Sequence, residues 1–172
     1  MPLLIDPAAS GARRDWNYLV QEDRVHRLLY TSEQIFRDEM LRIFGRSWFF
    51  VGHDSEVAEP GSYKTVTVGR RPLILARRED GAIDVLFNRC GHRGTILCRA
   101  ASGRGKFLAC PYHGWVYDLS GTLVGIPHAA GYGERVGNPA WNLGRAARVE
   151  TYHGLIFASL SPDVPVQALP CG

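Results

Sequence analysis

Two short stretches decide the fold of this chain: residues 90–94 read CGHRG and residues 110–115 read CPYHGW. Each stretch offers one cysteine and one histidine, and each histidine has a glycine beside it that lets the backbone come close to a bound group. Thiolates are soft ligands that hold iron–sulfur clusters, and imidazoles bind iron while raising its reduction potential. The pattern therefore indicates a metal centre clamped between two hairpin-tip loops.

The spacing is Cys-x-His, then 17 residues, then Cys-x-x-His. It resembles the ligand pattern of a Rieske 2Fe-2S centre, in which two cysteines hold one iron and two histidines hold the other. The flanking sequences, FNRCGHRG at 87–94 and CPYHGWVYD at 110–118, are similar to those of the large (alpha) subunit of bacterial aromatic-ring-hydroxylating dioxygenases. The resemblance implies four cluster ligands: Cys90, His92, Cys110 and His113.

A zinc site and structural residues without a metal are two other interpretations of this pattern. A structural zinc site also uses cysteine and histidine, but it usually has two or more residues between paired ligands, whereas Cys90 and His92 have one between them. Four structural residues without a metal would have to fall into this pattern by accident. The spacing therefore favours the iron–sulfur interpretation. The other histidines, at positions 26, 53, 128 and 153, have no neighbouring ligand at a useful spacing.

Length and composition describe an ordinary globular chain. Its 172 residues are 45% hydrophobic and 22% charged, which is enough for one real core. The net charge of +3 is modest and the basic residues form no run, so nucleic acid is not an implied partner. No stretch has the length needed to span a bilayer, and the N-terminus lacks the basic region of a signal peptide. We therefore expect a cytoplasmic protein without a membrane partner.

The four cysteines do not indicate a disulfide framework, because two belong to the ligand pattern and the others, Cys98 and Cys171, lie far apart. Cys98 is expected to be a small buried hydrophobe. High-potential Rieske proteins, by resemblance, carry two extra cysteines that form a disulfide, and here other residues such as Tyr112 take their places. We therefore expect a reduction potential toward the low end of the Rieske range, roughly −150 mV.

The first 50 residues are expected to form an arm, residues 1–29, and a lead-in helix, residues 30–50, that packs on the domain. Within this helix Thr31 can cap, with Gln34 at the reciprocal capping-box position, and apolar residues recur at three- and four-residue intervals up to a stop at Gly45. This segment also resembles the lead-in helix of the dioxygenase alpha subunits, which a free-standing Rieske ferredoxin normally lacks.

Beyond residue 60 the apolar periodicity shortens to two, as in strands. Strands are expected at 63–68, 73–76, 83–88, 106–110, 116–117, 122–124, 147–152 and 155–160. These short strands predict a mainly β fold. With the resemblance, it is a Rieske-type antiparallel β sandwich with cluster-binding loops at one end, preceded by a helix. The Rieske domain is expected to span residues 51–165, followed by a tail at 166–172.

Residues around the ligands are assigned supporting roles. Backbone N–H groups of the two loops are expected to donate to sulfur atoms and so raise the potential. Arg93 complements either the cluster charge or a docking partner, or forms a salt bridge to the body of the protein. We expect packing, rather than a place in the electron path, to be the main role of Trp115 and Tyr117.

The resemblance implies an oxidoreductase subunit that relays single electrons. The family's alpha subunit also has a catalytic domain with mononuclear non-haem Fe(II), and no two-histidine, one-carboxylate set for it occurs in this sequence. We therefore expect electrons to pass from a ferredoxin or reductase, through an exposed histidine ligand such as His113, to iron in a catalytic domain or a neighbouring alpha subunit. A beta subunit is a further possible partner.

The sequence leaves two matters open. A stand-alone Rieske-type electron carrier, or a zinc-loaded structural module, would show much of the same pattern. Some stretches are similar to the dioxygenases of aromatic carboxylates and others to those of polycyclic hydrocarbons, so the substrate is predicted only as an aromatic ring. This chain alone is not expected to hydroxylate.

Overall fold

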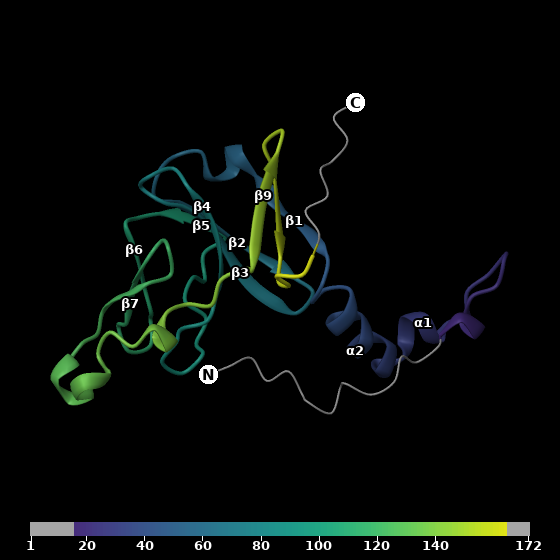
Figure 1. Cartoon of the computed structure of the whole chain (residues 1–172), viewed down its shortest axis with the longest axis horizontal. Helices are drawn as coiled ribbons and strands as arrows, with labels where there is room; N and C mark the ends of the chain where they lie inside the picture. The colour runs from purple at the N-terminus through teal and green to yellow at the C-terminus, as the bar shows by residue number, and fades with distance from the viewer. Residues whose placement is uncertain (1–15, 165–172) are drawn as a thin grey trace.

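The computed structural model describes residues 16–164 and shows a mainly β protein with a helical N-terminal extension (Figure 1). Two helices come first, α1 (Leu28–Thr31) and α2 (Glu33–Arg42). The strands of the described residues are β1 (Trp48–His53), β2 (Ser62–Val68), β3 (Arg71–Arg77), β4 (Ile83–Phe87), β5 (Ser102–Arg104), β6 (Phe107–Ala109), β7 (Val116–Asp118), β8 (Leu123–Gly125), β9 (Arg148–Tyr152) and β10 (Leu155–Ser159). The predicted mainly β fold is confirmed. Residues 1–15 of the expected arm, the tail at 166–172 and Cys171 lie outside the described residues.

Within residues 16–164 the strands form three antiparallel sheets, with the orders β1-β10-β9, β4-β3-β2-β5 and β6-β7-β8. Strands β6 and β7 form a separate lobe at one side of the molecule (Figure 1). The tips of this lobe carry the second predicted ligand loop. No helix in this part of the chain has the length and apolar character needed to cross a membrane.

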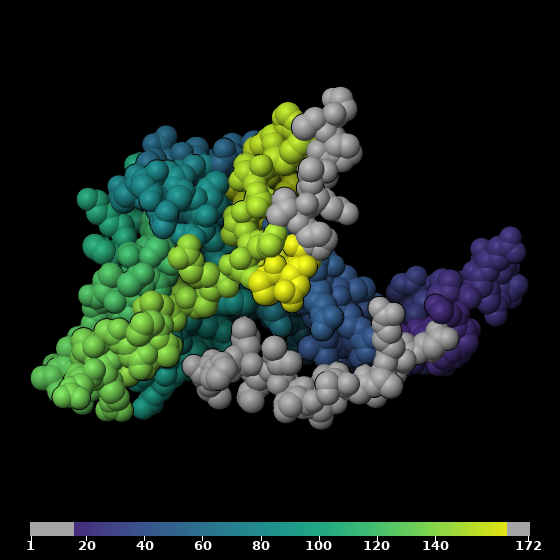
Figure 2. Space-filling view, viewed as in Figure 1, coloured from purple at the N-terminus to yellow at the C-terminus, as the bar shows by residue number. Residues whose placement is uncertain are grey.

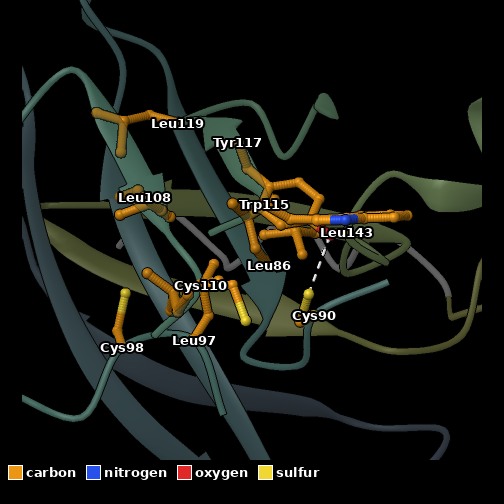
Figure 3. Packing of buried hydrophobic residues seen from close by; sticks show 12 residues of the cluster. Leu86, Cys90, Leu97, Cys98, Leu108, Cys110, Trp115, Tyr117, Leu119 and Leu143 are labelled. Atoms are coloured by element: carbon orange, nitrogen blue, oxygen red, sulfur yellow. Dashed lines mark hydrogen bonds between the residues drawn. The ribbon is translucent and has the colours of Figure 1, made fainter. Parts of the chain in front are cut away.

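Strand β3 divides the interior into two cores. Successive side chains of a strand point to opposite faces, so the buried run from Leu73 to Ala76 serves both. Ile74 and Ala76 belong to the core beneath the predicted ligands, whereas Leu73 and Leu75 belong to the core under β1 and β10. The first core also contains Cys90 and Cys110 (Figure 3). The ligand loops are thus anchored in the hydrophobic interior.

Two strands were not predicted. Residues 48–50 were assigned to the lead-in helix, yet Trp48–His53 forms β1, which pairs with β10 and has the aromatic and β-branched composition of a strand. Ser102–Arg104 has little strand propensity and forms β5 only because it pairs with the edge of β2. In both cases the partner strand lies far away in the sequence.

The lead-in helix is shorter than predicted. Ser32, and not Thr31, is the N-cap of α2, and its hydroxyl accepts a bond from the Ile35 amide at 3.4 Å. The helix ends at Arg42, three residues before the expected stop at Gly45.

The packing of this helix is also more limited than expected. Of the residues of α2, only Ile35 is buried, while Phe36 is 38% exposed. One face of α2 reaches the turn between β2 and β3, where the Arg70 guanidinium lies 6.0 Å from the Phe36 ring. Just after the helix, the Phe44 ring stacks on Phe49 of β1 at 5.1 Å. The helices therefore extend away from the sheets (Figure 2).

Candidate metal centre

The two predicted ligand loops share one backbone geometry. In the first loop the Cys90 amide donates to the Thr95 carbonyl at 2.8 Å, and the Gly94 amide donates to the Cys90 carbonyl at 2.8 Å. In the second loop the Cys110 amide donates to Trp115 at 2.7 Å, and the Gly114 amide donates back to Cys110 at 3.0 Å.

Both glycines of this motif have positive φ, +71° at Gly94 and +68° at Gly114. A side chain would be strained in this region of backbone conformation, and glycine adopts it freely. The sequence patterns CGHRG and CPYHGW thus encode two turns with the same backbone geometry. The second turn joins the paired strands β6 and β7, whereas the first follows β4, which pairs with β3 and not with the next strand, β5.

The structure brings the two cysteines together. Cys90 and Cys110 are each 4% exposed, and their sulfur atoms turn toward the same space (Figure 3). Burial raises the pKa of Cys90, and the neighbouring Cys110 thiol raises it further, whereas bonds from Tyr117 and the His92 amide lower it. The His92 amide is therefore one of the expected backbone donors to a ligand sulfur. A bound cation that stabilises both thiolates would reverse the cost of burial.

The two histidines also converge. The rings of His92 and His113 lie 4.6 Å apart between centroids. Nδ1 of His92 is buried and has no hydrogen-bond partner, an unusual state for a polar atom in a folded protein. His113 is exposed, and Tyr112 stacks against it with ring centroids 3.7 Å apart. An imidazole nitrogen that lacks a partner, beside a second imidazole and two thiols, has the donor chemistry of a metal ligand.

The donor set fits a two-iron cluster. Two sulfur and two imidazole donors divide into two pairs, as a Rieske cluster requires. Among the described residues, no three His, Cys, Asp or Glu side chains are grouped so that they could hold one metal ion. The structure places the two cysteines in one core and the two histidine rings side by side, and the assignment of all four residues as ligands stays a prediction.

Tyr117 makes a contact that was not predicted. Its hydroxyl lies 3.3 Å from the Cys90 sulfur and accepts a bond from the Gly91 amide at 3.0 Å. Because the oxygen accepts from Gly91, its own hydrogen is free to point at the sulfur. Burial raises the pKa of Tyr117 far above the ordinary value, so this hydroxyl keeps its proton. Tyr117 packs in the core as expected, with no exposed surface, and also serves as a hydrogen-bond donor toward Cys90.

Asn88 holds the chain on the far side of the first loop. Its Oδ1 accepts from the amides of Leu97 and Cys98 at 2.9 and 2.8 Å, and its Nδ2 donates to the Cys98 carbonyl at 2.7 Å. The residue is 2% exposed, so these bonds replace all contact with water. In the sequence, the only sign that Asn88 fixes this loop is its position two residues before Cys90.

An aromatic enclosure surrounds His92. Its ring stacks on Trp115 at 4.7 Å, and Tyr132 and Trp141 pack edge-on or tilted against Trp115 at 5.7 and 5.2 Å. Trp141 also restricts the loop backbone, because a Cβ added at Gly91 would run into the Trp141 carbonyl. Tyr132 and Trp141 lie on two 3-10 segments, Ala129–Arg135 and Pro139–Trp141, whose contacts no local pattern revealed.

The remaining histidines of residues 16–164 either accept hydrogen bonds from the backbone or lie exposed on the surface. Nδ1 of His26 accepts from the Leu28 amide, and Nδ1 of His53 accepts from the Ser55 amide, both at 3.2 Å. His128 and His153 are exposed residues with positive φ.

The profile of the Rieske [2Fe-2S] domain matches residues 47–155. The chain therefore belongs to the Rieske [2Fe-2S] domain family, whose cofactor is the Rieske cluster. Within that family it matches the N-terminal part of dioxygenase alpha subunits.

Two relatives and two solved structures are similar to most of this chain. It is 39% identical over 167 residues to the chlorobenzene dioxygenase subunit alpha of Cupriavidus sp. (strain PS12), covering 93% of this chain and 37% of the relative. It is 40% identical over 161 residues to the benzene 1,2-dioxygenase subunit alpha of Pseudomonas putida, covering 90% and 36%. Naphthalene 1,2-dioxygenase with indole bound superimposes with a TM-score of 0.80 at 35% identity, covering 86% of this chain and 34% of the other. A quaternary ammonium Rieske monooxygenase gives a TM-score of 0.73 at 31% identity, covering 81% and 38%. The chain thus spans little more than a third of the length of these relatives.

Proposed function

We propose that this chain is the electron-relay domain of an aromatic-ring-hydroxylating dioxygenase alpha subunit. The proposal is carried by two loops of the same backbone geometry that present two buried thiols and two imidazole rings 4.6 Å apart, one of which carries the unpartnered Nδ1 of His92. When bound, a Rieske cluster accepts and releases one electron at a time. The protein supplies the ligands, the hydrogen bonds that tune them and the exclusion of water.

We assign Cys90 and Cys110 to one iron and His92 and His113 to the other, because thiolates and imidazoles differ in softness and in their effect on the potential. The buried positions of the cysteines and the outward position of His113 support this division. The domain assignment, with a Rieske domain at 51–165 behind an arm and a lead-in helix, belongs to the same proposal.

His113 is the ligand through which we expect electrons to leave. It is exposed, and Tyr112, which stacks on it, is 59% exposed. A partner can therefore come within contact of this ligand without unfolding the loop. The acceptor we propose is mononuclear iron in a catalytic domain or in a neighbouring alpha subunit, and the donor is a ferredoxin or reductase. A beta subunit is a further possible partner.

The substrate class follows from the relatives alone. The names of the relatives include chlorobenzene, benzene and biphenyl dioxygenases. We propose an aromatic ring and no finer class, because these names share an aromatic ring and differ in what it carries. We place the protein in the cytoplasm, where Cys90, Cys98 and Cys110 would remain reduced as they are here.

The first test is spectroscopic. The chain is loaded with iron and sulfide, reduced with dithionite and examined for iron content, acid-labile sulfide and electron paramagnetic resonance. We expect about two irons and two sulfides per chain and a Rieske signal, because two cysteines and two histidines divide the cluster. A zinc-loaded protein without sulfide would contradict the proposal.

The second test concerns the ligand assignment. His113→Cys should keep iron bound while it changes the Rieske spectrum and lowers the potential, because a thiolate donates more charge than an imidazole. His26→Cys, which changes an exposed histidine two residues before α1, is the matched control and should leave the spectrum unchanged. An unchanged spectrum in His113→Cys would remove His113 from the ligand set.

A third test separates the relay from a stand-alone carrier. The cluster-loaded chain is mixed with ferredoxin, reductase and an aromatic substrate, alone and with an alpha subunit whose own cluster ligands are substituted. We expect no product from the chain alone. Product that depends on the chain in the mixture supports a relay, and transfer to unrelated acceptors only would support a stand-alone carrier.

A further inference from the structure

Charge is unevenly distributed around the predicted centre. Residues 85–117 contain five basic residues and no acidic one, while all 17 acidic residues lie elsewhere with the other 15 basic ones. The stretch that carries both ligand loops is therefore positive in a chain that is otherwise slightly negative. A local field of this kind attracts an oppositely charged partner.

Three of these basic residues surround the first ligand loop. Arg93 follows His92 in the loop and is exposed. Arg89 precedes Cys90, and its Nη2 lies 3.7 Å from the position that a Cβ of Gly94 would take, so its guanidinium lies against the loop. Arg99 is exposed and lines an open hollow together with Thr95 and Ile96, the residues that directly follow the loop.

These three cations are not neutralised by an ion pair in the part of the chain that the structure describes. Within residues 16–164 no ion pair is formed by Arg89, Arg93 or Arg99. Arg104, by contrast, lies 4.0 Å from Glu59. A single solvated arginine is common on any surface, but three around one loop leave an uncompensated field next to the predicted centre.

The second loop differs in this respect. Residues 110–117 contain no charged side chain. Their exposed groups are Pro111, Tyr112 and His113. The two loops thus offer chemically different surfaces to partners, one cationic and one neutral and aromatic.

We infer that an acidic one-electron protein carrier docks on the arginine rim, defined as Arg89, Arg93 and Arg99, and delivers its electron on the side of the first loop. This inference rests on the proposed function and adds the partner's charge and its docking place. The carrier loses one electron and the cluster-loaded domain gains it, with no bond made or broken. The neutral surface of the second loop remains open to the electron acceptor. Such encounters use small interfaces in which charge mainly sets the rate of association.

The first experiment measures the field with small probes of opposite charge. The cluster-loaded chain is reduced with dithionite and mixed in a stopped-flow instrument with hexacyanoferrate(III), an anion, or hexaammineruthenium(III), a cation. We expect Arg93→Glu to slow oxidation by hexacyanoferrate(III) roughly threefold to tenfold and to speed oxidation by hexaammineruthenium(III), because the local potential changes sign.

The matched control is Arg27→Glu, which makes the same charge change at the exposed N-cap of α1. Strands β6 and β7 lie at the opposite end of the molecule from α1 (Figure 1). The control should change neither rate more than about twofold, because exposed charges beyond a Debye length are screened. Equal effects of the two substitutions would overturn the inference.

The second experiment uses an acidic plant-type ferredoxin as the reductant, whose potential near −400 mV makes transfer to a Rieske centre favourable. Arg89→Glu combined with Arg93→Glu should lower the second-order rate constant about tenfold or more at 10 mM salt. The difference should shrink at 150 mM salt, as the Debye length falls from about 30 Å to about 8 Å. A rate that the substitutions leave unchanged at low salt, or tighter binding to duplex DNA than to the ferredoxin, would contradict an acidic protein partner.

Each variant is first checked for iron content and its paramagnetic signal. A wild-type chain that forms no Rieske signal would contradict the proposed function, whereas a normal signal with unchanged rates would contradict only the docking inference. Should Arg93→Glu lose its cluster, Arg93→Gln and Arg99→Glu carry the same test. Both should move the hexacyanoferrate(III) rate in the same direction by a smaller factor.

Discussion

The two ligand loops have the same backbone and opposite surroundings. The first is held by Tyr117 and Trp141, which contact the backbone of Gly91, and by Asn88, which binds the chain after the loop. The second ends in the exposed side chains of Tyr112 and His113. The two loops therefore have different roles. The first sets the environment of the predicted centre, and the second makes the centre accessible from the surface. Four tests by substitution examine this difference, from the largest expected effect to the smallest.

The sharpest test replaces one glycine in each loop by alanine. Gly91→Ala should destabilise the protein by about 3 kcal/mol or more, because its Cβ would collide with backbone atoms of Trp141 that cannot move independently. Gly114→Ala should cost about 1–2 kcal/mol, because it adds strain at φ +68° but meets only the Pro127 ring, at 3.1 Å. Urea unfolding and iron content measure both. A larger loss in Gly114→Ala would mean that the second loop is the more constrained.

The next test removes the clamp behind the first loop. Asn88→Ala leaves the buried amides of Leu97 and Cys98 and the Cys98 carbonyl without partners, for a loss of about 3 kcal/mol. Asn142→Ala is the matched control, since its Oδ1 accepts one bond, from the Leu123 amide at 2.9 Å, and about 1 kcal/mol is expected. Chemical denaturation of both variants gives the comparison. Similar losses would show that the clamp is not special to the first loop.

This asymmetry marks the limit of what the sequence predicts. The loop tips follow from local pattern, since Cys90 and Gly94, or Cys110 and Gly114, bond within one turn. The mainly β fold likewise follows from alternation along each strand. The contacts of Tyr117 and Trp141 with the first loop join residues far apart in the sequence, and β1 and β5 form only through partner strands. Tertiary pairing decides these features, and no local pattern reports them.

The buried side of the first loop extends to Cys98, which gives the third test. Burial raises the pKa of Cys98 to about 11 from an ordinary value of 9.0. A raised pKa means that the folded chain keeps the proton more tightly than the unfolded chain, so the stabilisation is present below pH 9 and lost as the pH rises toward 11. The free energy of unfolding should therefore fall by up to about 2–3 kcal/mol more in the wild type than in Cys98→Ala over that interval.

Denaturation at pH 8.5 and 10.5 measures the difference between the two proteins. Cys98→Ala should also leave the Rieske signal unchanged at pH 7, because Cys98 is not among the proposed ligands. A parallel loss of stability in the two proteins would show that the Cys98 thiol is as accessible to water as the side chains of the second loop.

The smallest effect is a shift in reduction potential. The Tyr117 hydroxyl should stabilise the reduced, more negative centre through the Cys90 sulfur, so Tyr117→Phe should lower the potential. A hydrogen bond of about 0.5–1.5 kcal/mol corresponds to roughly 20–60 mV for one electron. This contribution opposes the low potential that the missing companion cysteines predict, so the wild-type value should lie above roughly −150 mV. Tyr63→Phe is the matched control, because Tyr63 bonds to Cys98, which is not a proposed ligand, and redox titration should find its potential unchanged. Equal shifts in both variants would trace the effect to general packing, and the first loop would then tune the centre no more than any other part of the core.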